Sequence, residues 1–389
     1  MKKVGLVTYY GDNYGGILQA YALQTVVKKQ GLECEIISND FLKKERRSHT
    51  FAKKMKASLQ LLRNPKVYLS KRRSYRAHST EVAFRAKRFE NFRNLYLDIF
   101  HTGYTTYEQY AEIADKYDIY LCGSDQIWNP NLYSQNGFYF AEFGAKVALK
   151  VAYASSIGLS QVNTKQAEFM KPMLEQLDII STREQKGAEI IKSISNKSAR
   201  VVLDPTLLLN ADEWLRLSAP PLFEKPYLLC YLFGERAYVD DVKRRVKELT
   251  GLQVVTMPFV ARELDSDDVK LFDVGPSEFI SLIRNASLVL TDSFHATAFS
   301  VNLRTPFISL CRFDKNDKKS MNDRLVTFLN TVGLQDRLLD ADSPIAADYL
   351  YDVDFEGAHM LLEEKRYADT RFLIEALNHD KARGLYGNL

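Results

Sequence analysis

The chain has 389 residues, of which 46% are hydrophobic and 26% charged, a composition typical of a globular protein with two domains. It contains no run of about 20 apolar residues, and its first predicted element is a strand rather than a signal segment. These features exclude a membrane-spanning helix and favour the cytoplasm. Its four cysteines lie far apart without metal-ligand spacing, so we expect buried reduced thiols and no metal site.

Charge is distributed unevenly along the chain. The net charge is +4, yet residues 43–93 contain 17 Lys and Arg against three acidic residues, so the remainder of the chain is acidic. Such a segment suits an anionic membrane surface, nucleic acid or a merely solvated face. Because the segment lacks zinc-finger and RNP spacing, we do not expect a nucleic-acid partner.

The first 40 residues predict a strand–helix–strand unit. An apolar strand at 4–9 is followed by a glycine-rich break at 11–16, then by apolar residues at helical spacing up to Val26. A second strand follows at 34–40. Two strands joined by one helix in so short a segment indicate a βαβ unit and therefore a parallel sheet.

The basic segment interrupts this pattern. Apolar residues recur at helical spacing at 51–62, and Phe89, Phe92 and Tyr96 form a second stripe, with lysines and arginines on the other faces. We therefore predict an insertion of amphipathic basic helices over 43–98.

The α/β pattern then resumes and continues through the rest of the chain. Strands are predicted within 117–128, 150–158, 177–184, 199–209, 226–234, 253–259, 287–291 and 306–310, and helices before Thr250 and at 276–286, 292–302 and 357–378. The pattern predicts an N-terminal domain at 1–210, a C-terminal domain at 226–345 and a helical segment at 346–389 that packs back on them. Two doubly wound parallel-sheet domains would form a ligand cleft where the carboxyl ends of their strands face each other.

The glycine-rich loop after the first strand is the first candidate for a ligand site. It has neither dinucleotide-binding nor P-loop spacing, although a helix N-terminus with free N–H groups suits an anion. The Asp12 carboxylate argues against a phosphate. Asp12 and Asn13 could cap the helix or bind hydroxyl groups, with Gly15 allowing the other domain to come close, so a ligand-binding loop and a tight turn both stay open.

A second candidate loop follows the strand that ends near Cys122. Asp125 and Gln126 lie beside Trp128 in "CGSDQIWN". Polar groups beside an exposed tryptophan suit a sugar, whose face stacks on aromatic rings while its hydroxyls bind fixed partners. A capped turn with a core tryptophan is the alternative interpretation.

The segment "TDSFHATAFS" at 291–300 contains the best catalytic candidate. Asp292 or Ser293 can cap a helix that begins where a strand ends, which places His295 in the first helical turn at the edge of the sheet. Histidine can donate and accept protons near neutral pH.

Three arginines are candidate anion ligands. Arg183 follows a strand and either faces the cleft or forms an ordinary surface ion pair, while Arg312 directly follows another strand end and Arg324 lies further along. We interpret Asp204, in "LDPTLLL", mostly as part of a structural turn.

Taken in order, "GDNYGGILQAYALQ", "CGSDQIWN", "ASSIG", "STRE", "LDPTLLL" and "TDSFHATAFSVNLRTPF" resemble the polysaccharide pyruvyl transferase family over residues 4–330. The resemblance implies a GT-B-like pair of Rossmann-type domains. It also implies transfer of the enolpyruvyl unit of phosphoenolpyruvate to a sugar. His295 matches the family histidine proposed to exchange the proton, and Arg183 an arginine associated with the donor. Some members have an arginine at the position of Ser293, which is a departure here.

The resemblance implies a site divided between donor and acceptor. We expect His295 to be catalytic, phosphoenolpyruvate to be the co-substrate without a further cofactor or metal, and a sugar or lipid-linked oligosaccharide to be the acceptor. The donor-binding residues would be Arg183, Arg312, Ser293 and Arg324, and the acceptor-binding residues Asp12, Asn13, Gly15, Asp125, Gln126 and Trp128. The basic segment 43–93 would bring a cytoplasmic enzyme to the inner face of the membrane during capsule, exopolysaccharide or cell-wall glycan synthesis.

Two alternatives stay open. One is a GT-B glycosyltransferase that uses a nucleotide-sugar, and the other is a non-catalytic glycan-binding protein of the same fold, which the Ser293 departure motivates. The sequence does not predict the acceptor sugar, the choice between ketal and enolpyruvyl product, or the oligomeric state.

Overall fold

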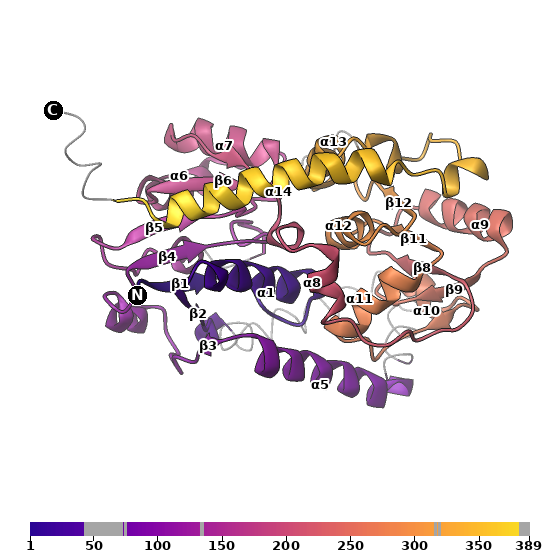
Figure 1. The fold of residues 1–389 in the computed structure, drawn as a ribbon, viewed down its shortest axis with the longest axis horizontal. Helices are drawn as coiled ribbons and strands as arrows, with labels where there is room; N and C mark the ends of the chain where they lie inside the picture. The colour runs from indigo at the N-terminus through magenta and orange to yellow at the C-terminus, as the bar shows by residue number, and fades with distance from the viewer. Residues whose placement is uncertain (43–72, 74–75, 133–135, 315–316, 318–319, 381–389) are drawn as a thin grey trace.

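The structure is a computed structural model that describes residues 1–42, 73, 76–132, 136–314, 317 and 320–380. The basic helix predicted at 51–62 lies outside the described residues, as does most of the predicted membrane-binding segment. Two α/β domains lie side by side, the N-terminal one in indigo to magenta and the C-terminal one mainly in orange (Figure 1). None of the described helices is both long enough and apolar enough to cross a bilayer.

The N-terminal domain is built on a parallel sheet, which has seven strands in the described part of the chain, in the order β3-β2-β1-β4-β5-β6-β7. The strands are β1 (Lys3–Val7), β2 (Glu33–Ile37), β3 (Ile99–Phe100), β4 (Ile119–Cys122), β5 (Leu149–Ala152), β6 (Ile179–Thr182) and β7 (Arg200–Val201). The α-helices of this half are α1 (Tyr14–Lys29), α5 (Ser79–Tyr96), α6 (Thr164–Glu175), α7 (Gln185–Ser195) and α8 (Ala211–Leu215). The central strands are buried on both faces, as expected for short apolar runs between helices.

The C-terminal domain repeats this design with a parallel sheet in the order β10-β9-β8-β11-β12-β13. The strands are β8 (Tyr227–Tyr231), β9 (Gln253–Thr256), β10 (Val269–Lys270), β11 (Leu288–Thr291), β12 (Phe307–Leu310) and β13 (Leu338–Leu339). The helices are α9 (Tyr238–Thr250), α10 (Ala261–Leu264), α11 (Pro276–Asn285), α12 (Phe294–Asn302), α13 (Asp323–Thr331) and α14 (Phe355–Leu377). Both sheets have the strand order of doubly wound nucleotide-binding folds, which confirms the predicted pair of Rossmann-type domains.

Helix α14 returns from the C-terminal domain to the N-terminal one, as the yellow ribbon in Figure 1 shows. Its buried Asp369 accepts a hydrogen bond from the backbone N–H of Leu203 at 2.8 Å. Arg366 donates to the carbonyl of Leu207 at 2.6 Å and to the side chain of Asn302 at 3.0 Å. The helix therefore connects residues that belong to the two different domains.

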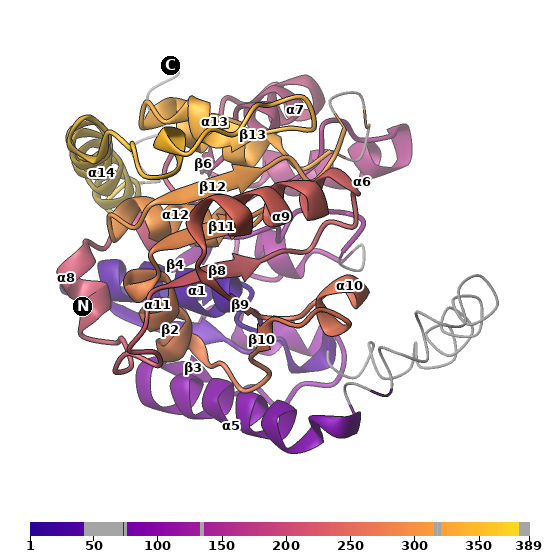
Figure 2. The ribbon, with the colours of Figure 1, turned by 90° about the vertical axis from the view of Figure 1, so that its right-hand side faces the viewer.

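The described part of the basic insertion also contacts both domains. Phe89 and Phe92 of α5 are buried in the core, as their spacing predicts. On the same helix, Arg88 donates to the carbonyl oxygen of Asp273 at 2.7 Å and lies 3.4 Å from the carboxylate of Glu278. Figure 2 shows α5 lying along the base of the molecule. This part of the basic segment therefore uses positive charge to hold the C-terminal domain.

Tyr14, the first residue of α1, is inserted into the C-terminal domain. Its ring stacks on Phe279 with a centroid separation of 4.6 Å, and its hydroxyl donates to the carbonyl of Val274 at 2.9 Å. Apolar residues of both domains form one continuous cluster around this contact. The packing therefore presses the N-terminus of α1 against the second sheet.

Candidate active site

A small pocket lies between the two domains where the carboxyl ends of their central strands face each other. Its volume is about 130 Å³. The residues that line it are Asn13, Gly15, Asp125 and Gln126 of the N-terminal domain and Tyr231, Phe233, Ser293, Phe294, His295, Arg312 and Arg324 of the C-terminal domain. Doubly wound folds bind ligands at this edge, next to the strand pair where the winding reverses. The structure thus brings together eight of the residues selected from the sequence.

His295 extends from the first turn of α12, directly after β11. The side chain of Ser293 caps this helix by accepting from the backbone N–H of Ala296. The Asp292 carboxylate instead accepts backbone N–H groups of Phe233 and Gly234, so Ser293 is the capping residue of the two considered. The end of β11 and the cap of α12 together direct the buried imidazole toward the N-terminal domain.

Gly15 lies directly opposite the imidazole. A Cβ atom at this position would overlap Nδ1 of His295, deep inside van der Waals contact. Any side chain here would therefore displace the histidine or push the domains apart. The glycine in the first turn of α1 is required by the approach of the second domain.

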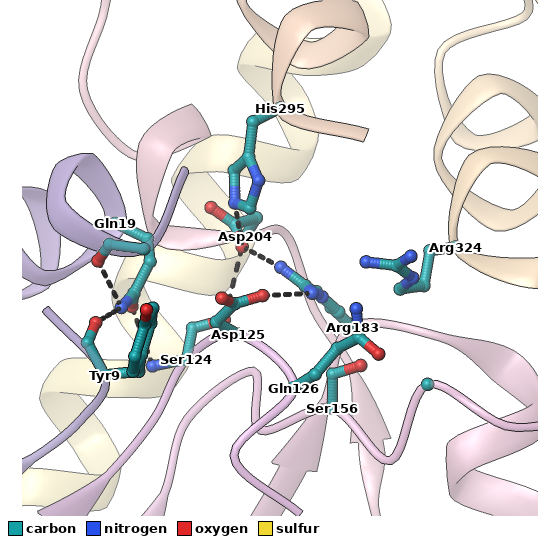
Figure 3. Close-up of polar contacts among 12 residues, drawn as sticks. Tyr9, Gln19, Ser124, Asp125, Gln126, Ser156, Arg183, Asp204, His295 and Arg324 are labelled. Atoms are coloured by element: carbon teal, nitrogen blue, oxygen red, sulfur yellow. Dashed lines mark hydrogen bonds and ion pairs between the residues drawn. The ribbon is translucent and has the colours of Figure 1, made fainter. Parts of the chain in front are cut away.

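Asp204 is the acidic partner of His295. Its Oδ2 lies 3.7 Å from Nε2 of His295, longer than a hydrogen bond but within ion-pair distance of a protonated imidazole (Figure 3). The buried carboxylate also accepts from Arg183 Nη1 at 2.7 Å, from Ser124 Oγ at 3.2 Å and from Thr206. Burial raises the pKa of Asp204, but the neighbouring His295 and Arg183 lower it by more, to below its usual range.

Arg183 occupies the centre of the buried network rather than the pocket wall. Its guanidinium lies 2.9 Å from Asp125 and 2.7 Å from Asp204 and also packs on the ring of Phe294 at 4.8 Å. Two carboxylates thus share its charge, and its side chain is almost completely buried. Arg183 does not line the pocket at His295, and its Nη1 and Nη2 donate to carboxylates, whereas its buried Nε has no hydrogen-bond partner among the described residues. Its role as an anion ligand therefore stays a prediction.

Arg324 differs from Arg183, because it is a buried cation without a carboxylate partner among the described residues. It is 9% exposed, its Nε donates a long hydrogen bond to the carbonyl of Met321 at 3.4 Å, and no described carboxylate lies within ion-pair distance. Burial, together with the charges of Arg183 and Arg312, lowers the pKa of Arg324 to about 9. In Figure 3 its guanidinium points toward the Arg183 cluster. An anionic ligand in the pocket would supply the missing counter-charge.

Arg312, by contrast, is paired. It donates to both carboxylate oxygens of Asp292, at 3.2 and 3.0 Å, and its guanidinium packs over Phe233. Arg312 nevertheless lines the pocket. It therefore contributes positive potential beside Arg324 without being an unpaired charge.

The predicted acceptor-binding residues do not all lie at the same pocket. Asn13 caps α1 by accepting from the N–H of Gly16 at 2.9 Å and lines the pocket. The Asp12 side chain is 57% exposed, pairs with Arg93 at 2.6 Å and lines a different pocket. Asp12 is thus not the cap of α1 and does not line the pocket at His295. The predicted acceptor-binding residues therefore do not all line one pocket.

Trp128 is a core residue. It is 2% exposed, stacks on Phe140 with a centroid separation of 5.0 Å, and donates its indole N–H to the carbonyl of Tyr139 at 3.0 Å. The prediction of an exposed sugar-stacking tryptophan is wrong, because both faces and the polar edge are used in the interior.

Asp125 and Gln126 do line the pocket. Burial raises the pKa of Asp125, but the charges of Arg183, His295 and Arg324 lower it by more, so this carboxyl is ionised. The Oε1 of Gln126 accepts from the side chain of Asn129 at 2.9 Å.

Sequence reasoning missed two residues that organise the site. Asp204 was interpreted as a turn, and it does cap the short 3-10 helix η3 (Pro205–Leu207), but it also faces His295. Gln19 donates from Nε2 to the carbonyl of Tyr9 and accepts from the N–H of Ser124, which ties the first loop to the loop after β4. The available signal for Asp204 was an acidic residue shortly after a strand of the N-terminal sheet, at the edge that faces the C-terminal sheet and His295.

Glu184, which follows Arg183 in the motif "STRE", has a structural role. This buried carboxylate accepts from Ser156 Oγ and from the N–H groups of Ile157 and Gly158, all at 2.9–3.0 Å. Burial raises the pKa of Glu184 despite the nearby Arg183. Glu184 thereby holds the "ASSIG" loop behind the pocket.

Among curated proteins, none matches the sequence of this chain. Among solved structures, a UDP-N-acetylglucosamine 2-epimerase is similar with a TM-score of 0.53, at 12% identity over 97% of this chain and 95% of the other. The Methanocaldococcus jannaschii UDP-GlcNAc 2-epimerase gives 0.48 at 12% identity, covering 94% and 92%. The spinosyn rhamnosyltransferase SpnG gives 0.44 at 10%, covering 97% and 100%. The first likeness concerns the fold alone and, with the two facing parallel sheets, confirms the predicted GT-B-like architecture.

The sequence also matches a family model that spans both domains. The model is that of polysaccharide pyruvyl transferase, and it covers residues 13–310, from the cap of α1 to the end of β12. This range includes His295, Asp204 and Arg183 together with most of the pocket wall. The match extends over more than half of the chain, and the chain therefore belongs to the polysaccharide pyruvyl transferase family.

Proposed function

We propose that this protein transfers the pyruvyl or enolpyruvyl unit of phosphoenolpyruvate to a hydroxyl group of a saccharide. The observation that carries the proposal is the unpaired, buried guanidinium of Arg324, which shares a small pocket with His295 in a member of this family. The pocket therefore combines a demand for an anion with a group that can transfer a proton.

The donor site is argued from charge. Phosphoenolpyruvate carries a phosphate and a carboxylate, and Arg324 offers a cation without a carboxylate partner among the described residues. Ser293 stands where some relatives have an arginine, and it caps the nine-residue helix α12, whose N-terminal residues line the pocket; a helix N-terminus favours anions. Arg324 thus supplies the cation that Ser293 does not.

Pocket size favours this donor over a nucleotide-sugar. Sites for ligands of drug size usually have volumes of about 300–1,000 Å³. The pocket at His295 has about 130 Å³, which suits a three-carbon phosphate ester rather than a nucleoside diphosphate linked to a sugar.

The chemistry assigns one role to each group. Protonated His295 delivers its proton to the terminal methylene carbon, C3, of phosphoenolpyruvate, which makes C2 electrophilic. The acceptor hydroxyl forms a bond to C2 and gives its proton to the now neutral imidazole. The bond from C2 to the phosphate oxygen then breaks, and Arg324 stabilises the departing phosphate. The imidazolium passes the hydroxyl proton to the departing phosphate and becomes neutral again. It then accepts either a C3 proton, which gives the enolpyruvyl ether, or the proton of a second attacking hydroxyl, which gives the ketal.

Asp204 and Arg183 act as positioning residues in this scheme. The Asp204 carboxylate, held ionised by Arg183, faces the imidazolium that must exist before proton transfer. The pair therefore fixes the direction of the imidazole, as a buried acid does for a catalytic histidine elsewhere.

His295→Gln tests the proposal. General acid–base catalysis contributes about 10²- to 10⁴-fold, so phosphate release from phosphoenolpyruvate over a panel of saccharides should fall by that factor. The urea midpoint of unfolding should stay close to that of the unaltered protein. Turnover equal to that of the unaltered protein would remove His295 from the mechanism. Thermal stabilisation by nucleotide-sugars and not by phosphoenolpyruvate would support the glycosyltransferase alternative.

A further inference from the structure

A second, larger pocket lies beside the catalytic one in the N-terminal domain. Its volume is about 410 Å³ and its lining consists of Tyr9, Tyr10, Gly11, Asp12, Asn39, Leu42 and Arg93. These residues follow the carboxyl ends of β1 and β2 or extend from α5, at the same sheet edge as the catalytic pocket. Asp12 lines this pocket, and the next residue, Asn13, lines the catalytic one. The two cavities are therefore separated by the wall of one loop.

The charges of the second pocket cancel. Arg93 Nη1 lies 2.6 Å from Oδ1 of Asp12, and these are the charged side chains that line the cavity. The catalytic pocket differs, because Arg324 has no carboxylate within ion-pair distance among the described residues. An anion therefore prefers the catalytic pocket, whereas the second pocket suits an uncharged polar ligand.

The lining is suited to hydroxyl groups. Tyr10 is 4% exposed, and its hydroxyl is a buried polar atom without a hydrogen-bond partner in the part of the chain that the structure describes. Burial raises the pKa of Tyr10 above its usual range, so this hydroxyl keeps its proton and can donate once a ligand in the pocket displaces the side chains that cover it. Tyrosine rings together with carboxylate, amide and guanidinium groups offer a sugar both apolar faces and planar hydrogen-bond partners.

We propose that this second pocket binds the acceptor saccharide, with the reactive hydroxyl reaching past Asn13 into the catalytic pocket. The inference rests on the proposed function and adds the location and chemistry of the acceptor site. Size agrees with this division, because about 130 Å³ leaves little room beside the donor, whereas about 410 Å³ lies in the usual range for small-ligand sites.

Tyr10→Phe is the sharpest test. The change removes one buried hydroxyl that has no partner among the described residues, so the urea midpoint should stay the same or rise. Binding of methyl β-D-galactopyranoside, methyl β-D-glucopyranoside and methyl β-D-mannopyranoside is measured by ligand-detected NMR titration. The Kd of the hexosides that bind should rise about 3- to 10-fold, the value of one lost hydrogen bond. Tyr153→Phe, which removes another buried hydroxyl without a partner, should leave these Kd values unchanged.

Asp12→Ala provides an independent variant. Because the Asp12 side chain is more than half exposed, its loss should leave the fold intact while hexoside binding weakens. Asp241→Ala, which removes the exposed partner of Arg244 on α9, is the matched control and should bind hexosides like the unaltered protein. The proposal is overturned if no hexoside binds, or if both Tyr10→Phe and Asp12→Ala bind them as the unaltered protein does.

Thermal stabilisation by phosphoenolpyruvate separates the two proposals. Stabilisation in all four variants, without any effect of Tyr10→Phe or Asp12→Ala on hexosides, would refute the acceptor pocket alone. Hexoside binding that responds to both variants, without stabilisation by phosphoenolpyruvate, would refute the donor assignment and leave a sugar-binding pocket.

Discussion

Replacing Arg324 by methionine should make the ligand-free protein more stable. The guanidinium is buried without a carboxylate partner among the described residues, and its pKa falls from its usual value to about 9. At about 1.36 kcal/mol per unit, this decrease corresponds to at most ~5 kcal/mol of destabilisation by the charged form. Methionine keeps an unbranched, flexible side chain that fills part of the space of the arginine, but it loses one weak hydrogen bond to Met321. We therefore expect the free energy of unfolding to rise by about 1–3 kcal/mol at pH 7.

The sign of the pH dependence follows from the same decrease. Because the folded-state pKa of Arg324 lies below that of the unfolded chain, the penalty is complete below about pH 9 and is relieved as the pH rises further. The difference between Arg324→Met and the unaltered protein should therefore be larger at pH 7 than at pH 10. Urea denaturation of both proteins at the two pH values measures it.

Arg337→Met is the matched control for this experiment. Arg337 is also completely buried, but its guanidinium donates to the carbonyls of Phe307, Tyr349 and Leu350. Its loss leaves buried acceptors unsatisfied and should destabilise the protein by about 3 kcal/mol or more. Phosphoenolpyruvate should stabilise the unaltered protein and not Arg324→Met. If Arg324→Met is less stable than the unaltered protein, or still binds phosphoenolpyruvate with the same affinity, the anion-site reasoning is refuted.

Two further substitutions test how the site is held. Asp204→Asn removes the charge that faces His295 and half of the pairing of Arg183, so we expect kcat to fall about 10²- to 10³-fold and the unfolding free energy to fall by about 3 kcal/mol. Steady-state kinetics and urea titration measure both, and unchanged kcat would contradict the positioning role. Gly15→Ala should improve helix propensity by about 1 kcal/mol, yet its Cβ overlaps the imidazole, so turnover should fall at least tenfold. Full turnover in that variant would show that the domains do not meet at Gly15.

Local sequence determined the elements and several side-chain positions. Short apolar runs between helical patterns form parallel strands, and the central strands are buried because helices cover both faces of each sheet. Asn13 and Ser293 are helix caps because their short polar side chains follow strand ends and precede apolar turns. His295 could be placed at the edge of the sheet for the same reason. These features depend on neighbours a few residues apart, which a single sequence displays.

The pairing of charges and the burial of rings were decided by the tertiary structure. Arg183 is neutralised by Asp125 and Asp204, which lie 58 and 21 residues away in the chain, whereas Arg324 finds no such carboxylate among the described residues. Trp128 is enclosed by Phe140 because the loop after β4 folds inward. No periodicity or local motif encodes which charge meets which, since the free energy of a buried ion depends on every group that the fold places around it. The sequence therefore identified eight residues of the candidate site, and the packing of the two domains decided which side chains are paired and which line the pocket.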